Sequence, residues 1–144
     1  MWFRLSLAML TILPLGLWAQ SAADSSAIRQ AALDYIEGYY MGDGPRMERA
    51  LHPELAKRIV RTNDQGQSRL DQMSAMTLVM GTRAGGGTRI PAAERRSDVT
   101  ILDIYQNAAS AKIYASGWVD YLHLAKSNGR WVIVNVLWEL HPRP

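Results

Sequence analysis

The spacing of apolar residues predicts a long helix at the start of the folded part of the chain. Apolar side chains recur at i, i+4, i+7 and i+11 and form one continuous stripe: Ile28, Ala32, Tyr35 and Tyr39. Asp24 and the two serines after it are good helix caps, and Gly42 is suited to end the helix. We therefore expect a helix from about residue 24 to residue 41 with this stripe buried.

Two shorter helices are predicted next. Pro45 favours the first turn of a helix over residues 45–51, and the sequence HPEL at 52–55 is typical of a turn. Ser68-x-x-Asp71 matches a capping box, which predicts a third helix that ends at Gly81. The loop that follows contains Gly85–Gly87. It lacks a phosphate-binding pattern, so we expect a mobile flap rather than an anion site.

The rest of the chain has the pattern of strands. We predict strands over residues 55–61, 99–106, 111–126 and 130–140, with a bend at Gly117 in the third. Asn128-Gly129 is the favoured two-residue turn of a β-hairpin between the last two strands. Because the helices come first and the strands cluster later, the expected class is α+β.

The closing hairpin has two distinct faces. Counting outward from its turn places Asp120 and Asn135 on one face. The other face is mostly apolar and consists of Val119, Tyr121, His123, Val132, Val134, Val136 and Trp138. Three helices cover only one side of such a sheet. We therefore expect a homodimer in which a second copy of the chain covers this second face.

Residues 1–19 have the pattern of a secretory signal peptide. Arg4 precedes an apolar run that is broken near its end by Pro14 and Gly16, and small residues follow. The run is shorter than the roughly 20 apolar residues of a membrane span, although an uncleaved N-terminal membrane anchor is the alternative. Cleavage near residues 19–21 would leave one domain over residues 24–141, located in the periplasm or outside the cell.

Composition narrows the classes of function. A length of 144 residues allows one domain, and a net charge of +3 with scattered Lys and Arg gives no reason to expect nucleic acid. The absence of cysteine excludes disulfides and thiolate metal sites. His52, His123 and His141 lack the close spacing of metal ligands, so we expect no metal and no cofactor.

Several short stretches, taken in order, resemble a known family. They are Gly42-Asp43, His52-Pro53, Asp120-Tyr121-Leu122, Lys126 and Gly129-x-Trp131. With the opening IRQAALDYIEGYYMGD, they make the chain from about residue 27 to residue 140 similar to the putative lumazine-binding family. That family belongs to the nuclear transport factor two-like superfamily, with the polyketide-cyclase-like proteins. The resemblance implies a cone: a strongly bent antiparallel sheet with about three helices on its concave face, often a dimer through its convex face.

The resemblance also directs attention to polar groups inside the cone, where enzymes of the superfamily use an Asp, Tyr or His. The expected ligand-binding residues are Tyr35, Tyr39, Trp118, Asp120 and Asn135. Asp120 can hold the strand in place, orient a ligand or act as a base. If Asp120 lines the cavity and is not needed for the fold, Asp120→Asn should leave the fold standing. His52 is expected to cap its turn and His123 to lie in the dimer interface, while the face of Asp103 is not assigned.

Two classes of function follow. The first is an exported small ligand-binding or self-association domain with an apolar cavity and no catalysis. The second is a small lyase, isomerase or hydrolase with Asp120 as the acid-base group. An enzyme would bring at least two titratable groups into one pocket, and the sequence places only Asp120 there. This favours the first class, since fold alone assigns no activity.

Overall fold

The computed structural model describes residues 15–142, with side-chain positions from residue 22. The elements of this part of the chain are α1 (Leu15–Met41), α2 (Gly44–Ala50), β1 (Leu51–Thr62), β2 (Ser68–Ser74), α3 (Ala75–Arg83), β3 (Ser97–Tyr105), β4 (Ala108–Ala115), β5 (Trp118–Ser127) and β6 (Arg130–Leu140), with a short 3₁₀ helix over Ala92–Glu94. Residues 1–14 of the predicted signal peptide lie outside the described residues. The leader and its cleavage near residues 19–21 therefore stay predictions. Among the described residues, no helix combines the length and hydrophobicity that a membrane crossing requires.

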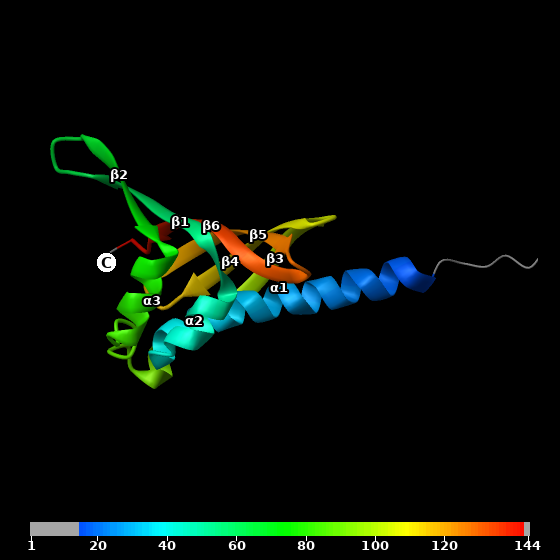
Figure 1. Cartoon of the computed structure of the whole chain (residues 1–144). Coiled ribbons are helices and arrows are strands. Elements are labelled where there is room, and N and C mark those ends of the chain that lie inside the picture. Colours follow the sequence, from blue (N-terminus) through cyan, green and yellow to red (C-terminus); the bar gives the residue numbers. More distant parts are fainter. Residues whose placement is uncertain (1–14, 143–144) are drawn as a thin grey trace, which may run out of the picture.

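The strands form one sheet in the order β2-β1-β6-β5-β4-β3. The sheet arches over α1, and α2 and α3 lie at one end of the molecule (Figure 1). Neighbouring strands are antiparallel except β1 and β6, which run parallel, so the sheet is mixed. Register shifts in the β1–β6, β3–β4 and β5–β6 pairs mark bulges that bend the strands. The expected α+β cone is confirmed, with one parallel pair in it.

The predicted stripe of α1 faces the core. Ile28, Ala32, Tyr35 and Ile36 are buried and belong to the same apolar cluster as the concave side of the sheet. Gly42 ends the helix with φ of +69°, the left-handed conformation that glycine adopts without strain. The helix begins earlier than expected, so Asp24 is not its cap. Its carboxylate instead accepts hydrogen bonds from Lys126 and Trp131.

A buried carboxylate joins α1 to α2. Asp34 is 4% exposed and accepts hydrogen bonds from Arg46 at 2.9 Å, Arg49 at 2.8 Å and Gln30 at 3.0 Å. Burial by itself would raise the pKa of Asp34, but the hydrogen bonds from Arg49, Arg46 and Gln30 outweigh it and lower the pKa from 3.8 to about 2. This joint fixes the position of α2, whose Met47 reaches the cavity described below.

The low pKa of Asp34 predicts an acid-sensitive contribution to stability. Because the carboxylate is favoured in the folded state, its contribution of about 2 kcal/mol is complete above about pH 4 and is lost as the pH falls through about 2. Urea unfolding from pH 5 to pH 2 should therefore show a steeper loss of stability for the wild type than for Asp34→Asn. Parallel pH profiles for the two proteins would contradict the assignment.

The prediction of a third helix is wrong for the first half of that segment. Residues 68–74 form β2, which pairs with β1 from Ala56–Ser74 to Thr62–Ser68. Asn63 makes this hairpin possible, because its side chain accepts hydrogen bonds from the backbone of Gln65 and Gln67 in the turn. The cap of α3 is Ser74, which accepts from the backbone of Thr77, and the helix continues past Gly81 to Arg83. The capping-box pattern at 68–71 was therefore a chance match in a strand.

The predicted strand over 111–126 is two strands. β4 and β5 form a hairpin that turns at Ser116-Gly117, with Tyr114 opposite Val119. The hydroxyl of Tyr40 holds this turn against α1 through hydrogen bonds with Ser116 at 3.0 Å and the carbonyl of Arg96 at 2.7 Å. The Ser-Gly pair was the turn signal in the sequence.

The turn expected at residues 52–55 is not a separate turn. These residues lie within β1, where the β1–β6 register shifts and His52 accepts a hydrogen bond from the backbone of Glu54.

The register of the closing hairpin is as predicted only near its turn. The pairs from Ser127–Arg130 to Leu124–Ile133 are confirmed, but a bulge at Val134 then pairs His123 with Asn135. One extra residue turns every later side chain of β6 to the opposite face. Asn135 therefore leaves the concave face, and the predicted convex set loses two members that face inward: Val136, in the core cluster, and Trp138, in the cavity wall.

The glycine loop after α3 packs against α1. A Cβ at Gly87 would collide with the carbonyl oxygen of Tyr39, and one at Gly86 would lie 3.2 Å from the Tyr39 ring. The glycines thus allow the loop to pass close to α1, which accounts for them without a mobile flap.

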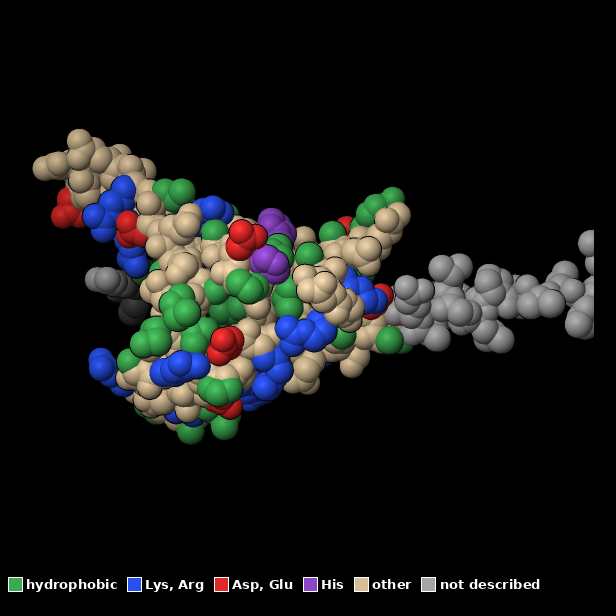
Figure 2. Space-filling model, in the orientation of Figure 1, with side chains coloured by type: hydrophobic (Ala, Val, Ile, Leu, Met, Phe, Trp, Pro, Cys, Tyr) green, Lys and Arg blue, Asp and Glu red, His purple; other side chains and the backbone are tan. Residues whose placement is uncertain are grey.

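Figure 2 shows hydrophobic side chains at the surface over α3, where Met76 and Met80 are 68% and 54% exposed.

Candidate functional site

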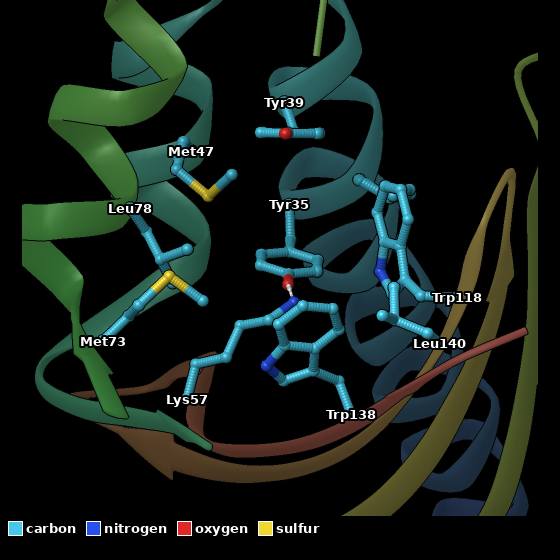
Figure 3. A pocket seen from close by; sticks show the side chains of 10 residues that line it. Tyr35, Tyr39, Met47, Lys57, Met73, Leu78, Trp118, Trp138 and Leu140 are labelled. Carbon is cyan, nitrogen blue, oxygen red and sulfur yellow. Dashed lines mark hydrogen bonds between the residues drawn. The ribbon is translucent and has the colours of Figure 1, made fainter. Parts of the chain in front are cut away.

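A cavity of about 300 Å³ opens inside the cone between the helices and the concave face of the sheet. Side chains from α1, α2, α3 and four strands line it, and most of them are apolar or aromatic (Figure 3). The lining residues are Tyr35, Ile36, Tyr39, Met47, Lys57, Met73, Leu78, Trp118, Trp138 and Leu140. A cavity of this composition suits a small, largely apolar molecule.

A buried ion pair lies at the bottom of this cavity. The ammonium of Lys57 donates hydrogen bonds at 2.6 Å to Asp120 Oδ1 and at 2.6 Å to the hydroxyl of Tyr35. Asp120 Oδ2 accepts from Trp118 Nε1 at 2.7 Å and from the Tyr35 hydroxyl at 3.3 Å. Lys57 is 5% exposed and Asp120 is fully buried. Both oxygens of the carboxylate are therefore occupied, and its charge is balanced.

Strand pairing brings these groups together. Lys57 lies in β1 between Leu55 and Ile59, two buried residues on the same face of the strand. Asp120 lies opposite Trp138 in the β5–β6 pair. Because β6 separates β1 from β5, the long side chain of Lys57 has to cross one strand to reach Asp120.

The low polarity around the pair shifts two pKa values. Burial lowers the pKa of Lys57 from 10.5, and the carboxylate of Asp120 opposes that shift. Burial also raises the pKa of Tyr35 well above 10, and the negative charge of Asp120 adds to this effect. Tyr35 is therefore a neutral phenol that accepts from Lys57 and donates to Asp120 at ordinary pH.

Aromatic rings surround the ammonium group. Lys57 Nζ lies 4.8 Å from the ring centre of Trp138, 5.3 Å from that of Tyr35 and 5.9 Å from that of Trp118. Figure 3 shows the hydroxyl of Tyr35 pointing at this ammonium, with the Trp138 ring beside it. Cation–π attraction to the Trp138 and Trp118 rings offsets part of the cost of burying the charge, while Tyr35 contributes through its hydroxyl.

A family model described as putative lumazine-binding matches residues 23–139. The chain belongs to this family. The match confirms the resemblance drawn from the sequence motifs. No curated protein matches the chain.

Solved structures share the fold of this putative lumazine-binding family member. An NTF2-like protein with a cystatin-like fold from Novosphingobium aromaticivorans has a TM-score of 0.68 at 12% identity, covering 95% of this chain and 94% of its own. NTF2-like proteins of unknown function from Methylobacillus flagellatus and Shewanella baltica are both 22% identical. Their TM-scores are 0.64 and 0.63, with 83% and 85% of this chain and 94% and 97% of their own chains covered. At these identities the likeness extends to the fold alone.

The cavity of this family member contains some of the predicted site residues. Tyr35, Tyr39 and Trp118 line it, while Asp120 lies beneath the lining and reaches it only through Tyr35, Lys57 and Trp118. Their role in ligand binding stays a prediction. Asn135 is on the other side of the sheet.

Asn135 belongs to a row of hydrogen-bonded side chains on the convex face. Arg58 donates to Gln72 at 2.8 Å and to the side-chain oxygen of Asn135 at 3.0 Å. Because a guanidinium only donates, the amide nitrogen of Asn135 faces His123 and donates to Nδ1 at 3.2 Å. The His123 proton in this arrangement is on Nε2. Asn135 therefore orients His123, as part of the outer surface.

Sequence reasoning missed Lys57, which provides the only ammonium group among the described residues that line this cavity. Its signal was present: in the predicted strand 55–61, Lys57 lies two residues from both Leu55 and Ile59 and so falls on the same apolar face.

Asp103, whose face was not assigned from the sequence, is exposed on β3. Within residues 15–142 no three His, Cys, Asp or Glu side chains gather as a metal site requires.

Proposed function

We propose that this protein is an exported, noncatalytic domain that binds a small, largely apolar molecule in its cone cavity. The single observation that carries this proposal is the 300 Å³ cavity walled by apolar and aromatic side chains. Burying such a molecule would remove apolar surface from water on both sides of the contact.

The proposal of export rests on the predicted leader alone. Mass spectrometry that finds an intact Met1 on the protein purified from its native host would contradict it.

The paired charges argue against catalysis by Asp120. A general base needs a free lone pair within reach of the substrate. Asp120 is fully buried and accepts three hydrogen bonds, from Lys57, Tyr35 and Trp118. Because the carboxylate has no exposed surface and is paired with Lys57, a substrate in the cavity could reach it only by displacing one of these donors. This favours binding over the alternative of a small lyase, isomerase or hydrolase that uses Asp120.

The binding proposal is tested with tetralin, a bicyclic hydrocarbon that fits a small apolar cavity. We expect calorimetric titration to detect saturable 1:1 binding, and Leu78→Trp to weaken it at least about tenfold by filling the space. Met80→Trp is the matched control, because Met80 is on the same helix, is 54% exposed and does not line the cavity. Equal affinity of tetralin for both variants, or absence of binding of both tetralin and its ketone 1-tetralone to the wild type, would refute the proposal.

A further inference from the structure

The hydrogen-bonding groups of the cavity are unbalanced towards donors. The ammonium of Lys57 has three N–H groups, and the described residues provide two acceptors for them, Tyr35 and Asp120. Trp138 Nε1 is buried with no hydrogen-bond partner among the described residues. Both side chains line the cavity. Two N–H donors thus belong to side chains of the cavity wall, and the covered indole N–H of Trp138 has to turn toward the cavity before it can meet a ligand.

Acceptors are scarce in the same cavity. None of the described lining residues is a carboxylate, and both oxygens of Asp120 already accept hydrogen bonds. The hydroxyl groups of the described lining belong to Tyr35 and Tyr39. The hydroxyl of Tyr35 accepts from Lys57 and donates to Asp120. A buried donor without a partner costs free energy, so a ligand with an acceptor would relieve a deficit that an apolar ligand leaves in place.

The charge of the site favours a neutral occupant. Lys57 and Asp120 balance each other at 2.6 Å. An anion added to this pair would bury a third charge and leave a net negative site, and a cation would meet the ammonium of Lys57. Either one loses its hydration without a free partner of opposite charge.

The shape of the walls favours a flat occupant. Tyr39 and Trp118 meet edge to face, with ring centres 5.9 Å apart and planes at 87°. Trp138 adds a third ring beside Lys57 (Figure 3). Flat faces of this kind pack well against a planar ring system.

We infer that the cavity is built for a neutral, flat molecule with a carbonyl-type acceptor that receives a hydrogen bond from Lys57, Trp138 or both. The inference rests on the proposed function and specifies the chemical class of its ligand. It also separates this site from one for polar heterocycles rich in N–H groups, because such ligands would find few acceptors here.

Three probes of similar size test the inference by calorimetric titration: tetralin, 1-tetralone and 1-naphthoate. They represent a hydrocarbon, its neutral ketone and an aromatic anion. We expect 1-tetralone to bind the wild type about tenfold more tightly than tetralin, and 1-naphthoate to bind more weakly than the ketone. Equal affinities for tetralin and 1-tetralone, or tightest binding of 1-naphthoate, would overturn the inference while leaving the proposed function standing. Failure of all three to bind would overturn both.

Variants of Lys57 and Trp138 test which N–H donor is responsible for the preference for 1-tetralone over tetralin. Trp138→Phe keeps a ring and removes one N–H, and Lys57→Met keeps the length of the side chain and removes the ammonium. If Lys57→Met fails to fold with Asp120 unpaired, Lys57→Met/Asp120→Asn removes both charges. We expect the preference for the ketone to shrink to about threefold or less in at least one variant, with tetralin affinity kept. Lys112→Met, a lysine change outside the cavity lining, should keep the full preference. A full preference in Trp138→Phe, in the Lys57 variant and in the two changes combined would overturn the inference.

Discussion

Replacing Asp120 with asparagine is expected to lower the free energy of unfolding by about 3–5 kcal/mol. The carboxylate is fully buried and is the counter-charge of Lys57, which is itself 5% exposed. An amide of the same shape can accept from Trp118 but leaves the ammonium without an opposite charge in an apolar site. The sequence left a structural role for Asp120 open beside a role in the cavity, and only the cavity role would let the asparagine variant leave the fold standing. Urea unfolding at pH 7 measures the difference.

Two comparisons make this measurement specific. Asp98→Asn breaks an exposed pair with Arg96, whose side chains are 61% and 55% exposed, and should cost no more than about 1 kcal/mol. Adding Lys57→Met to Asp120→Asn should recover part of the lost stability, because no unpaired charge then remains buried. A cost below about 1 kcal/mol for Asp120→Asn alone would mean that the ion pair does not hold the cone together.

Leu137→Lys is expected to turn a dimer into a monomer. We propose that two copies of the chain associate through the convex face of the sheet. Leu137 is 51% exposed there and pairs across strands with Tyr121, which is 48% exposed. The burial of each such side chain contributes about 1.5–3 kcal/mol, so several are needed to exceed the cost of association. A lysine at this point would bring a charge against the apolar surface of the partner.

Sedimentation velocity at micromolar concentration measures the change in assembly. Met80→Lys is the matched control, since Met80 is 54% exposed on α3, away from the sheet face, and should leave the dimer intact. The proposed contact differs from the one expected from sequence, because Val136 and Trp138 face inward and Leu137 takes their place. A wild-type chain that sediments as a monomer would refute the proposal.

Local patterns in the sequence determined much of the architecture. The apolar stripe of α1, its end at Gly42 and the Asn128-Gly129 turn depend on periodicity and backbone preferences within a few residues. The order of helices before strands was enough for the α+β class, and the ordered motifs were enough for the family. These features are readable because neighbouring residues alone decide them.

The site itself depended on tertiary structure. Lys57 and Asp120 are 63 residues apart in sequence, and they meet because β6 lies between their strands and runs parallel to one of them. The bulge at Val134 turned Trp138 into the cavity and Asn135 out of it, although the alternation of apolar residues along β6 is compatible with either register. Strand order and bulge position follow from how the whole sheet packs against α1, and no short stretch of sequence carries that information.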